Sequence, residues 1–338
     1  MSKLRLGIVG SGLIAGVIAD AVKQVEAIEL VAVASRRSAS ATVFAKEHGI
    51  TTTYNTWQDM LSSDAIDAVY IATPTACKEE IALFGAENRK HLLVEKPFAS
   101  VESLQKIITA AGSHGVAFMD ATHFSHNPRT QQIRDDMVAS IGEPQAVRSS
   151  FFFPLMDKSN IRFNPEKEPT GAVGDMGWYS MRAITEYLQP ATAIATIAGG
   201  IVRDDDTGAV IRGSGVVVFE DGKSSTFDFG YSIGVCVMDL DILGHEGMVS
   251  LSDFVLDWKN SFAFDEKDHI NGYIKRCGMV TPKDFEFVIA DSEEPQEVSM
   301  MRHFAAVTAD PSLEKNQQAV ALTLKTQDLL DSYRSAVK

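Results

Sequence analysis

Short apolar runs alternate with amphipathic stretches along the first 120 residues. Six runs rich in β-branched residues predict strands, and several are apolar throughout, as strands buried on both faces of a sheet are. These runs are residues 4–9, 30–34, 52–54, 68–71, 91–94 and 117–120. Helical periodicity marks the stretches between them at residues 38–48, 75–87 and 101–114. The alternation predicts a parallel sheet with crossover helices.

The pattern changes after a helix predicted at residues 128–140. Longer segments now alternate polar and apolar residues, which is typical of an antiparallel sheet with one covered face. The candidate strands are residues 146–153, 193–198, 210–219, 224–231, 238–243 and 248–251. An Asp221-Gly222 pair predicts a hairpin turn between the third and fourth of them.

The two patterns predict two domains of the α/β class, since 338 residues exceed the usual size of a single core. Residues 1–122 are predicted to form a domain with a doubly wound parallel sheet. Residues 123–338 are predicted to form an α+β domain with a large open, mostly antiparallel sheet. The closing segment, residues 315–337, is helical by periodicity, and packing back on the first domain is one arrangement open to it.

Composition indicates a soluble globular chain, with 45% apolar and 22% charged residues and no apolar stretch of membrane-spanning length. No export signal is visible. The three cysteines, Cys77, Cys236 and Cys277, are widely spaced, which argues against a disulfide framework and against a structural zinc site. A reducing compartment fits this pattern, so we expect a cytoplasmic protein.

The formal net charge is -14, and most of the acidic excess lies in residues 123–338. Such a surface repels phosphate backbones and anionic lipid, so nucleic-acid and membrane partners are not expected. The charge says little about a small neutral substrate.

A glycine-rich turn follows the first predicted strand and reads Gly10-Ser11-Gly12-Leu13-Ile14-Ala15. Between a strand and a helix, the pattern G-x-G-x-x-A predicts dinucleotide binding. Gly10 permits the tight turn, and Gly12 lets the backbone approach a pyrophosphate at the helix start.

The second strand ends in Ser35-Arg36-Arg37, where an acidic residue would bind the ribose of NAD. A guanidinium and a small hydroxyl group suit a 2′-phosphate, so the sequence predicts NADP, with NAD left possible. The alternative is that both arginines are solvated loop charges. The fourth strand ends in Thr73-Pro74, a turn expected beside the ribose on the nicotinamide side.

The fifth strand leads into Glu95-Lys96-Pro97. Ligands of an open α/β sheet lie outside the carboxyl ends of its strands, so Lys96 is expected to point toward whatever the glycine turn holds. Taken alone, a polar loop with a proline is also an ordinary exit from a strand.

The glycine turn, Ala72-Thr73-Pro74 and Glu95-Lys96-Pro97 together resemble the glucose-fructose oxidoreductase/inositol dehydrogenase/MocA (Gfo/Idh/MocA) family across essentially the whole chain. The resemblance implies a catalytic Lys96. It also implies that residues 1–122 are a Rossmann domain. Residues 123–338 would then bind substrate and form an oligomer interface through the open sheet, which implies a homodimer or homotetramer.

A second family motif of glycines followed by Asp-x-Gly-x-(His/Tyr) matches residues 171–179. Asp175 and Tyr179 are four apart at a helix start and are expected on one face. With Lys96 on the other domain, Tyr179 is expected to be the acid/base, Lys96 to stabilise the substrate oxygen, and Asp175 to hold a neighbouring hydroxyl group or position Lys96. With a tyrosine at position 179 where the family usually has a histidine, the chain resembles the branches of the family that act on sugars, ketosugars and cyclic diols.

Four further residues are candidate substrate contacts: His123, Arg129, Trp178 and Arg182. The chain departs from many relatives just before Pro128, where Ser125-His126-Asn127 stands in place of an arginine. A metal held by His123 and His126 is conceivable, but polar lining of a pocket is the favoured interpretation, and no metal is predicted.

The sequence therefore predicts an NADP-dependent oxidoreductase of a sugar, ketosugar or cyclic polyol. One alternative is a regulator that senses NADP without chemistry, although the presence of Lys96, Asp175 and Tyr179 argues against it. Another is the same chemistry on a non-sugar substrate, such as a dihydrodiol or a linear tetrapyrrole.

Overall fold

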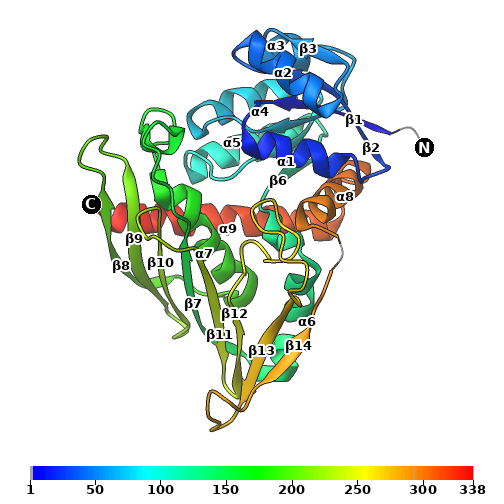
Figure 1. Cartoon of the computed structure of the whole chain (residues 1–338). Coiled ribbons are helices and arrows are strands. Elements are labelled where there is room, and N and C mark those ends of the chain that lie inside the picture. The colour runs from blue at the N-terminus through cyan, green and yellow to red at the C-terminus, as the bar shows by residue number, and fades with distance from the viewer. Residues whose placement is uncertain (1–2, 293, 338) are drawn as a thin grey trace. The chain divides into compact units, whose positions relative to one another are not determined.

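The computed structural model describes residues 3–292 and 294–337, and the chain divides into two compact units (Figure 1). Residues 1–126 and 295–324 form the first, here called the N-terminal unit. Residues 127–294 and 325–338 form the second, here called the sheet unit. The N-terminal unit thus contains a segment from near the chain end as well as the predicted Rossmann region.

The N-terminal unit is built on a six-stranded parallel sheet with the order β3-β2-β1-β4-β5-β6. Its strands are β1 (Leu4–Val9), β2 (Ile28–Ala34), β3 (Thr52–Tyr54), β4 (Ala68–Ile71), β5 (His91–Val94) and β6 (Phe118–Asp120). All six predicted strands are confirmed, with β2 beginning two residues earlier and β6 one residue later than expected. Because the strands are parallel, their carboxyl ends gather at one edge of the sheet.

Helices cover both faces of this sheet, as the amphipathic stretches predicted. They are α1 (Leu13–Val22), α2 (Ser38–His48), α3 (Trp57–Leu61), η1 (Thr75–Cys77), α4 (Lys78–Glu87), α5 (Val101–Ser113) and η2 (His123–His126). Local signals set their ends: the Ser100 hydroxyl accepts from the Ser103 amide at the start of α5, and α2 ends at Gly49 in the left-handed conformation.

A helix that the sequence analysis missed completes the core of the N-terminal unit. α8 (Gln296–Ala309) packs against α1 (Figure 1). It buries the side chains of Met301 and Phe304 completely. The first part of α9 (Glu314–Ala336) belongs to the same unit, where the Thr323 hydroxyl donates to Asp120 Oδ1 at 2.5 Å.

The sheet unit contains eight strands in the order β14-β13-β12-β11-β7-β10-β9-β8. They are β7 (Pro144–Phe152), β8 (Ile194–Arg203), β9 (Val210–Phe219), β10 (Ser224–Gly230), β11 (Val237–Gly244), β12 (Gly247–Leu251), β13 (Gly272–Cys277) and β14 (Glu286–Ile289). Only β7 and β10 pair in parallel, so the predicted mostly antiparallel sheet is confirmed. The hairpin at Asp221-Gly222 joins β9 to β10 as expected. The strands β13 and β14 were not predicted.

Helical segments pack on this sheet: α6 (Pro128–Ile141), α7 (Trp178–Ala183) and the rest of α9 from Lys325. The buried Tyr333 of α9 fixes its packing, because its hydroxyl donates to the carbonyls of Gly200 at 3.0 Å and Ser214 at 2.9 Å. Among the residues described, no helix is long and apolar enough to cross a membrane.

Candidate active site

The glycine turn lies at the carboxyl end of β1. Gly10 has φ 121°, and a Cβ there would lie 2.6 Å from the Ala72 carbonyl oxygen, so the turn requires glycine. The Gly10 amide also donates to the Ala34 carbonyl at 2.9 Å, which ties the turn to the end of β2. A Cβ on Gly12 would meet open space, and α1 begins at Leu13. The tight turn predicted for Gly10 is therefore confirmed, and a phosphate group fits against the open helix start.

Ser11 and Ser35 bring the turn and the end of β2 together, since their hydroxyl oxygens lie 2.9 Å apart. Arg36 and Arg37 follow immediately and are exposed. Within the described part of the chain neither forms an ion pair, so both guanidinium groups are accessible to an anionic ligand. The residues present at this edge fit the 2′-phosphate predicted for the cofactor.

At the end of β4, Pro74 precedes the 3₁₀ turn η1. The Thr73 hydroxyl is buried and finds no hydrogen-bond partner among the described residues. Buried hydroxyls normally have partners, so the Thr73 hydroxyl is left with an unmade hydrogen bond at the end of β4.

The Glu95-Lys96-Pro97 loop follows β5 directly, and the Lys96–Pro97 peptide bond is cis. Glu95 is buried, and the Tyr70 hydroxyl donates to its Oε1 at 2.5 Å. Burial raises the pKa of the Glu95 carboxyl, while Lys96, Tyr70 and Lys78 oppose that shift. A carboxyl group held in this way anchors the residue before Lys96.

His123 and His126 lie in η2, just beyond β6. Gln296 Nε2 lies 2.7 Å from His123 Nδ1, and His126 Nδ1 lies 3.1 Å from Nδ1 of His303. Burial lowers the pKa of His123 to about 3, and the charges of Lys96 and His126 act in the same direction. His123 is therefore neutral at physiological pH. No group of three histidine, cysteine or acidic side chains in residues 3–292 and 294–337 is arranged to hold a metal ion.

In the sheet unit, Asp175 lies in the π-helical turn η4 (Val173–Gly177), and Tyr179 lies in α7. The expected regular helix start is thus a π-helical turn, a feature that often occurs at functional sites. Tyr179 is buried, and its ring meets Phe151 edge-on with 5.3 Å between ring centroids. The ring is fixed by packing, which leaves the hydroxyl as its reactive group.

Two side chains that the sequence analysis did not single out bind the Asp175 carboxylate. Arg162 of η3 (Ile161–Phe163) forms an ion pair with it, and the Tyr231 hydroxyl donates to Asp175 Oδ2 at 3.0 Å. Burial raises the pKa of Tyr231 well above its usual value, and the Asp175 charge adds to the shift. Tyr231 therefore stays protonated and acts as a fixed hydrogen-bond donor to Asp175.

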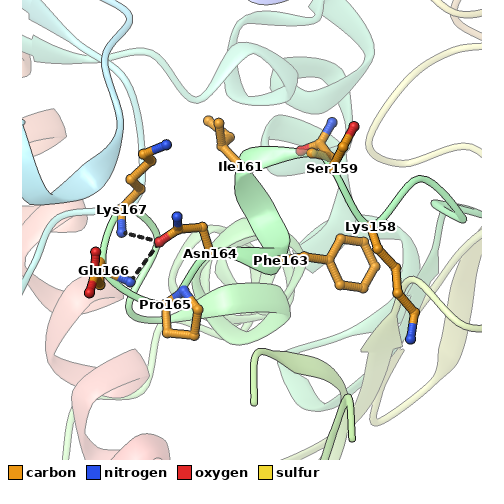
Figure 2. A pocket seen from close by; sticks show the side chains of 9 residues that line it. Lys158, Ser159, Ile161, Phe163, Asn164, Pro165, Glu166 and Lys167 are labelled. Carbon is orange, nitrogen blue, oxygen red and sulfur yellow. Dashed lines mark hydrogen bonds between the residues drawn. The ribbon is translucent and has the colours of Figure 1, made fainter. Parts of the chain in front are cut away.

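The loop that carries Arg162 borders an open surface pocket of about 420 Å³, lined by residues 158–161 and 163–167 (Figure 2). Asn164 closes the loop, because its Oδ1 accepts from the amides of Glu166 at 3.0 Å and Lys167 at 3.2 Å. Lys158 pairs with Asp204 at 2.7 Å. These contacts give the loop a defined shape and so position Arg162.

The remaining candidate contacts are buried within the sheet unit. Arg129 Nη1 binds both carboxylate oxygens of Asp253, at 2.8 and 2.9 Å. Arg182 Nε donates to Glu186 Oε1 at 2.9 Å, and Trp178 is completely buried. These ion pairs and this packing give the three residues structural roles, and their contact with substrate stays a prediction.

Lys78 is a third residue that the sequence analysis missed. Its buried ammonium donates to the carbonyls of Lys96 and Pro97, at 2.9 Å each. The sequence predicted a helix at residues 75–87, which makes Lys78 its fourth residue, so no local signal singled this lysine out. For Arg162 and Tyr231 no local signal exists, because they reach Asp175 from positions 13 and 56 residues away in the chain.

Family models match both halves of the chain. Residues 4–122 match the model GFO_IDH_MocA, described as an oxidoreductase family with an NAD-binding Rossmann fold. Residues 136–250 match the GFO/IDH/MocA C-terminal domain.

Two curated proteins are similar over part of their length. D-xylose 1-dehydrogenase (NADP(+)) 2 of Haloferax volcanii is 30% identical over 206 residues, which are 60% of this chain and 62% of that protein. scyllo-Inositol 2-dehydrogenase (NADP(+)) IolU of Bacillus subtilis is 34% identical over 132 residues, 39% of this chain and 40% of that protein. The chain thus aligns with less than two thirds of either relative.

Solved structures share the fold over the full chain. KijD10, a 3-ketoreductase from Actinomadura kijaniata in complex with NADP and TDP-benzene, superposes with a TM-score of 0.88 at 21% identity. The match covers 100% of this chain and 98% of that one. GenD2 from gentamicin A biosynthesis, in complex with NAD, gives a TM-score of 0.79 at 21% identity, covering 99% of this chain and 95% of that one. These likenesses confirm the predicted fold class.

Proposed function

The chain belongs to the GFO/IDH/MocA family of oxidoreductases, and from that premise we propose that it is an NADP-dependent dehydrogenase or reductase of a sugar, ketosugar or cyclic polyol. One observation carries the proposal: the glycine turn, the exposed Arg36 and the Lys96 loop follow strands of one parallel sheet at its carboxyl edge. Ligands of such sheets bind at this edge.

Residues at the carboxyl ends of β1, β2 and β4 would hold three parts of the cofactor. The amides at the start of α1 and the turn at Gly12 would bind the pyrophosphate, and Ser35 with Arg36 would bind the 2′-phosphate. Thr73 would use its unpartnered hydroxyl for the ribose on the nicotinamide side. When bound, NADP supplies a nicotinamide ring that accepts or donates a hydride.

Tyr179 would exchange a proton with the substrate oxygen, and Lys96 would stabilise the charge on that oxygen. In the oxidative direction the phenolate of Tyr179 would accept the proton of the carbinol oxygen. Bound NADP would supply the nicotinamide that takes up the hydride from the carbinol carbon, so that a carbon–oxygen double bond could form. Lys96 would stabilise the negative charge that develops on that oxygen. Reduction runs through the same groups in reverse, with Tyr179 giving its proton to the carbonyl oxygen.

Asp175 would accept a hydrogen bond from a neighbouring substrate hydroxyl. Its ion pair with Arg162 and its bond from Tyr231 support this role, because both hold the carboxylate in one orientation. A fixed anionic acceptor recognises polyhydroxylated substrates. The relatives named for xylose, scyllo-inositol and keto substrates are consistent with that class.

The decisive test is a cofactor-consumption screen over aldoses, ketosugars, inositols and dihydrodiols, with NADP(H) and NAD(H) in parallel. We expect NADP-dependent turnover of a sugar or polyol by the wild type and its loss in Lys96→Ala. Turnover of dihydrodiols alone would indicate a non-sugar enzyme. NADP binding without turnover on the whole panel would favour a sensing role and contradict the proposal.

The open sheet would provide the interface of a homodimer or homotetramer. A groove of about 700 Å³ crosses its central strands, and Arg148 there pairs with Asp241 at 3.0 Å. Both charge signs on one face let two copies pair by symmetry. Light scattering should give a dimer or tetramer mass for the wild type, and a monomer at all concentrations would contradict this assembly.

A further inference from the structure

A buried lysine supports the loop that carries Lys96. Lys78 opens α4, and only 3% of its surface is exposed. Its Nζ donates to the carbonyls of Lys96 and Pro97 at 2.9 Å each, and it lies 3.5 Å from the Thr75 hydroxyl oxygen. An ammonium group has three N–H donors, so these three acceptors can satisfy it.

This placement of Lys78 is costly on two counts. A buried ammonium loses its hydration, and a cation at the first position of α4 faces the positive end of the helix dipole. The rest of that first turn follows the usual preference, with Glu79 and Glu80. A neutral or acidic residue would serve the helix better, so the contact with the loop is the feature that accounts for a lysine here.

The loop is also fixed on its other side. The Glu95 amide donates to the Ile71 carbonyl at 3.1 Å, and the Tyr70 hydroxyl holds the Glu95 carboxyl group. Lys78 holds the two carbonyls that follow. The backbone of Lys96 is therefore restrained immediately before and after its Cα, which limits where the Lys96 side chain can point.

We propose that Lys78 is a positioning residue for Lys96. Its ammonium holds the carbonyls of residues 96 and 97 and links them to η1, the turn after Thr73-Pro74. Two loops predicted to face the cofactor are thereby held together at the carboxyl ends of β4 and β5. The inference rests on the proposed function, because it assigns Lys78 a part in the reaction for which Lys96 is proposed.

The chain offers a matched control. Lys90 is also buried, with 8% of its surface exposed, and its Nζ donates to the carbonyls of Ser63 at 2.8 Å and Ile66 at 2.9 Å. It belongs to the same unit, and within the described residues its ammonium forms no hydrogen bond or ion pair with the Lys96 loop. Lys90→Met removes the same kind of interaction as Lys78→Met, so it measures what losing a buried lysine does to the unit as a whole.

The first measurement is steady-state kinetics of the full chain on the best substrate of the screen. Lys78→Met should lower kcat by about tenfold or more with KM changed less than about threefold, because misplacing a catalytic group costs the transition state more than the bound substrate. Lys90→Met should keep kcat within about twofold. Lys78→Arg keeps a cation and donors and should recover most of kcat. Equal losses in Lys78→Met and Lys90→Met, or none in either, would overturn the proposal.

The second measurement does not depend on turnover. Hydrogen exchange of a peptide spanning residues 95–99 should be about tenfold faster or more in Lys78→Met and unchanged in Lys90→Met. If the wild type turns over no substrate, the proposed function has failed, and the hydrogen-exchange result alone then tests the role of the Lys78 contact. Unchanged exchange in Lys78→Met would overturn the inference. If Lys78→Met does not fold, Lys78→Gln, which keeps two N–H donors, takes its place in both measurements.

Discussion

The buried His123 should make the stability of the protein depend on pH in a way that one substitution removes. The imidazole ring is 4% exposed, and burial lowers its pKa to about 3 from 6.5. In the unfolded chain the same ring binds a proton near its ordinary pKa. Between these two values the unfolded state binds more protons than the folded state, so the free energy of unfolding falls as the pH falls.

The size of the effect follows from the two pKa values. At pH 7 both states are largely neutral at this residue, and the contribution is small. At pH 5 the unfolded ring is protonated and the folded ring is not. The difference of about 1.5 pH units below the ordinary pKa corresponds to about 2 kcal/mol of lost stability. The loss should continue down to about pH 3 and then level off.

The test compares wild type with His123→Asn, which keeps an acceptor for Gln296 but cannot titrate. Urea unfolding at pH 7 and pH 5 gives the free energy of unfolding of each protein. The wild type should lose about 2 kcal/mol more than the variant over this interval. The exposed His245 supplies the control, since His245→Gln should lose as much as the wild type. An equal loss in wild type and His123→Asn would refute the reasoning.

Two further predictions concern the cofactor and the sheet unit. Arg36→Glu should raise the Kd for NADP by about 10- to 100-fold, because hydrogen bonds to charged groups contribute about 1.5–3 kcal/mol. In the same calorimetric titrations the Kd for NAD should stay within about threefold. Equal weakening of both cofactors would contradict the 2′-phosphate assignment. Arg129→Met should lower the free energy of unfolding by about 3–5 kcal/mol, because it removes the close partner of the buried Asp253 and leaves only His269, at 3.9 Å, among the described residues. The double variant with Asp253→Leu should recover most of that loss in urea unfolding, and a double variant as unstable as Arg129→Met would argue against the ion pair as the cause.

Local patterns in the sequence were sufficient to predict much of the fold. The strands of the N-terminal unit are short apolar runs between polar breaks, and their burial on both faces makes that pattern strong. β14 lacks such a pattern because it is an edge strand, with 45% of Phe287 and 62% of Ile289 exposed. The packing of α8 in the N-terminal unit depends on contacts with residues far away in the sequence. It could not be predicted, since nothing within residues 296–309 specifies which distant element the apolar side of α8 packs on.

The candidate site divides in the same way. The turn at Gly10 was predictable, because a strand, a positive-φ glycine and a helix start are adjacent in the chain. The contacts of Asp175 were not predictable, because Arg162 and Tyr231 come from separate segments of the chain and meet Asp175 only in the folded sheet unit. The support of Lys96 by Lys78 was not predictable either, because the two residues come from separate segments that meet only in the folded unit.

The central claim is that this chain transfers a hydride between NADP and a carbinol carbon, with Tyr179 moving the proton. The most direct measurement uses NADPH in which both hydrogens at C4 of the nicotinamide are deuterium, and it follows the label into a ketosugar by mass spectrometry. The account predicts one deuterium on the new carbinol carbon with the wild type and a strongly reduced rate of labelling with Tyr179→Phe. A product without deuterium, or equal rates for the two proteins, would contradict it.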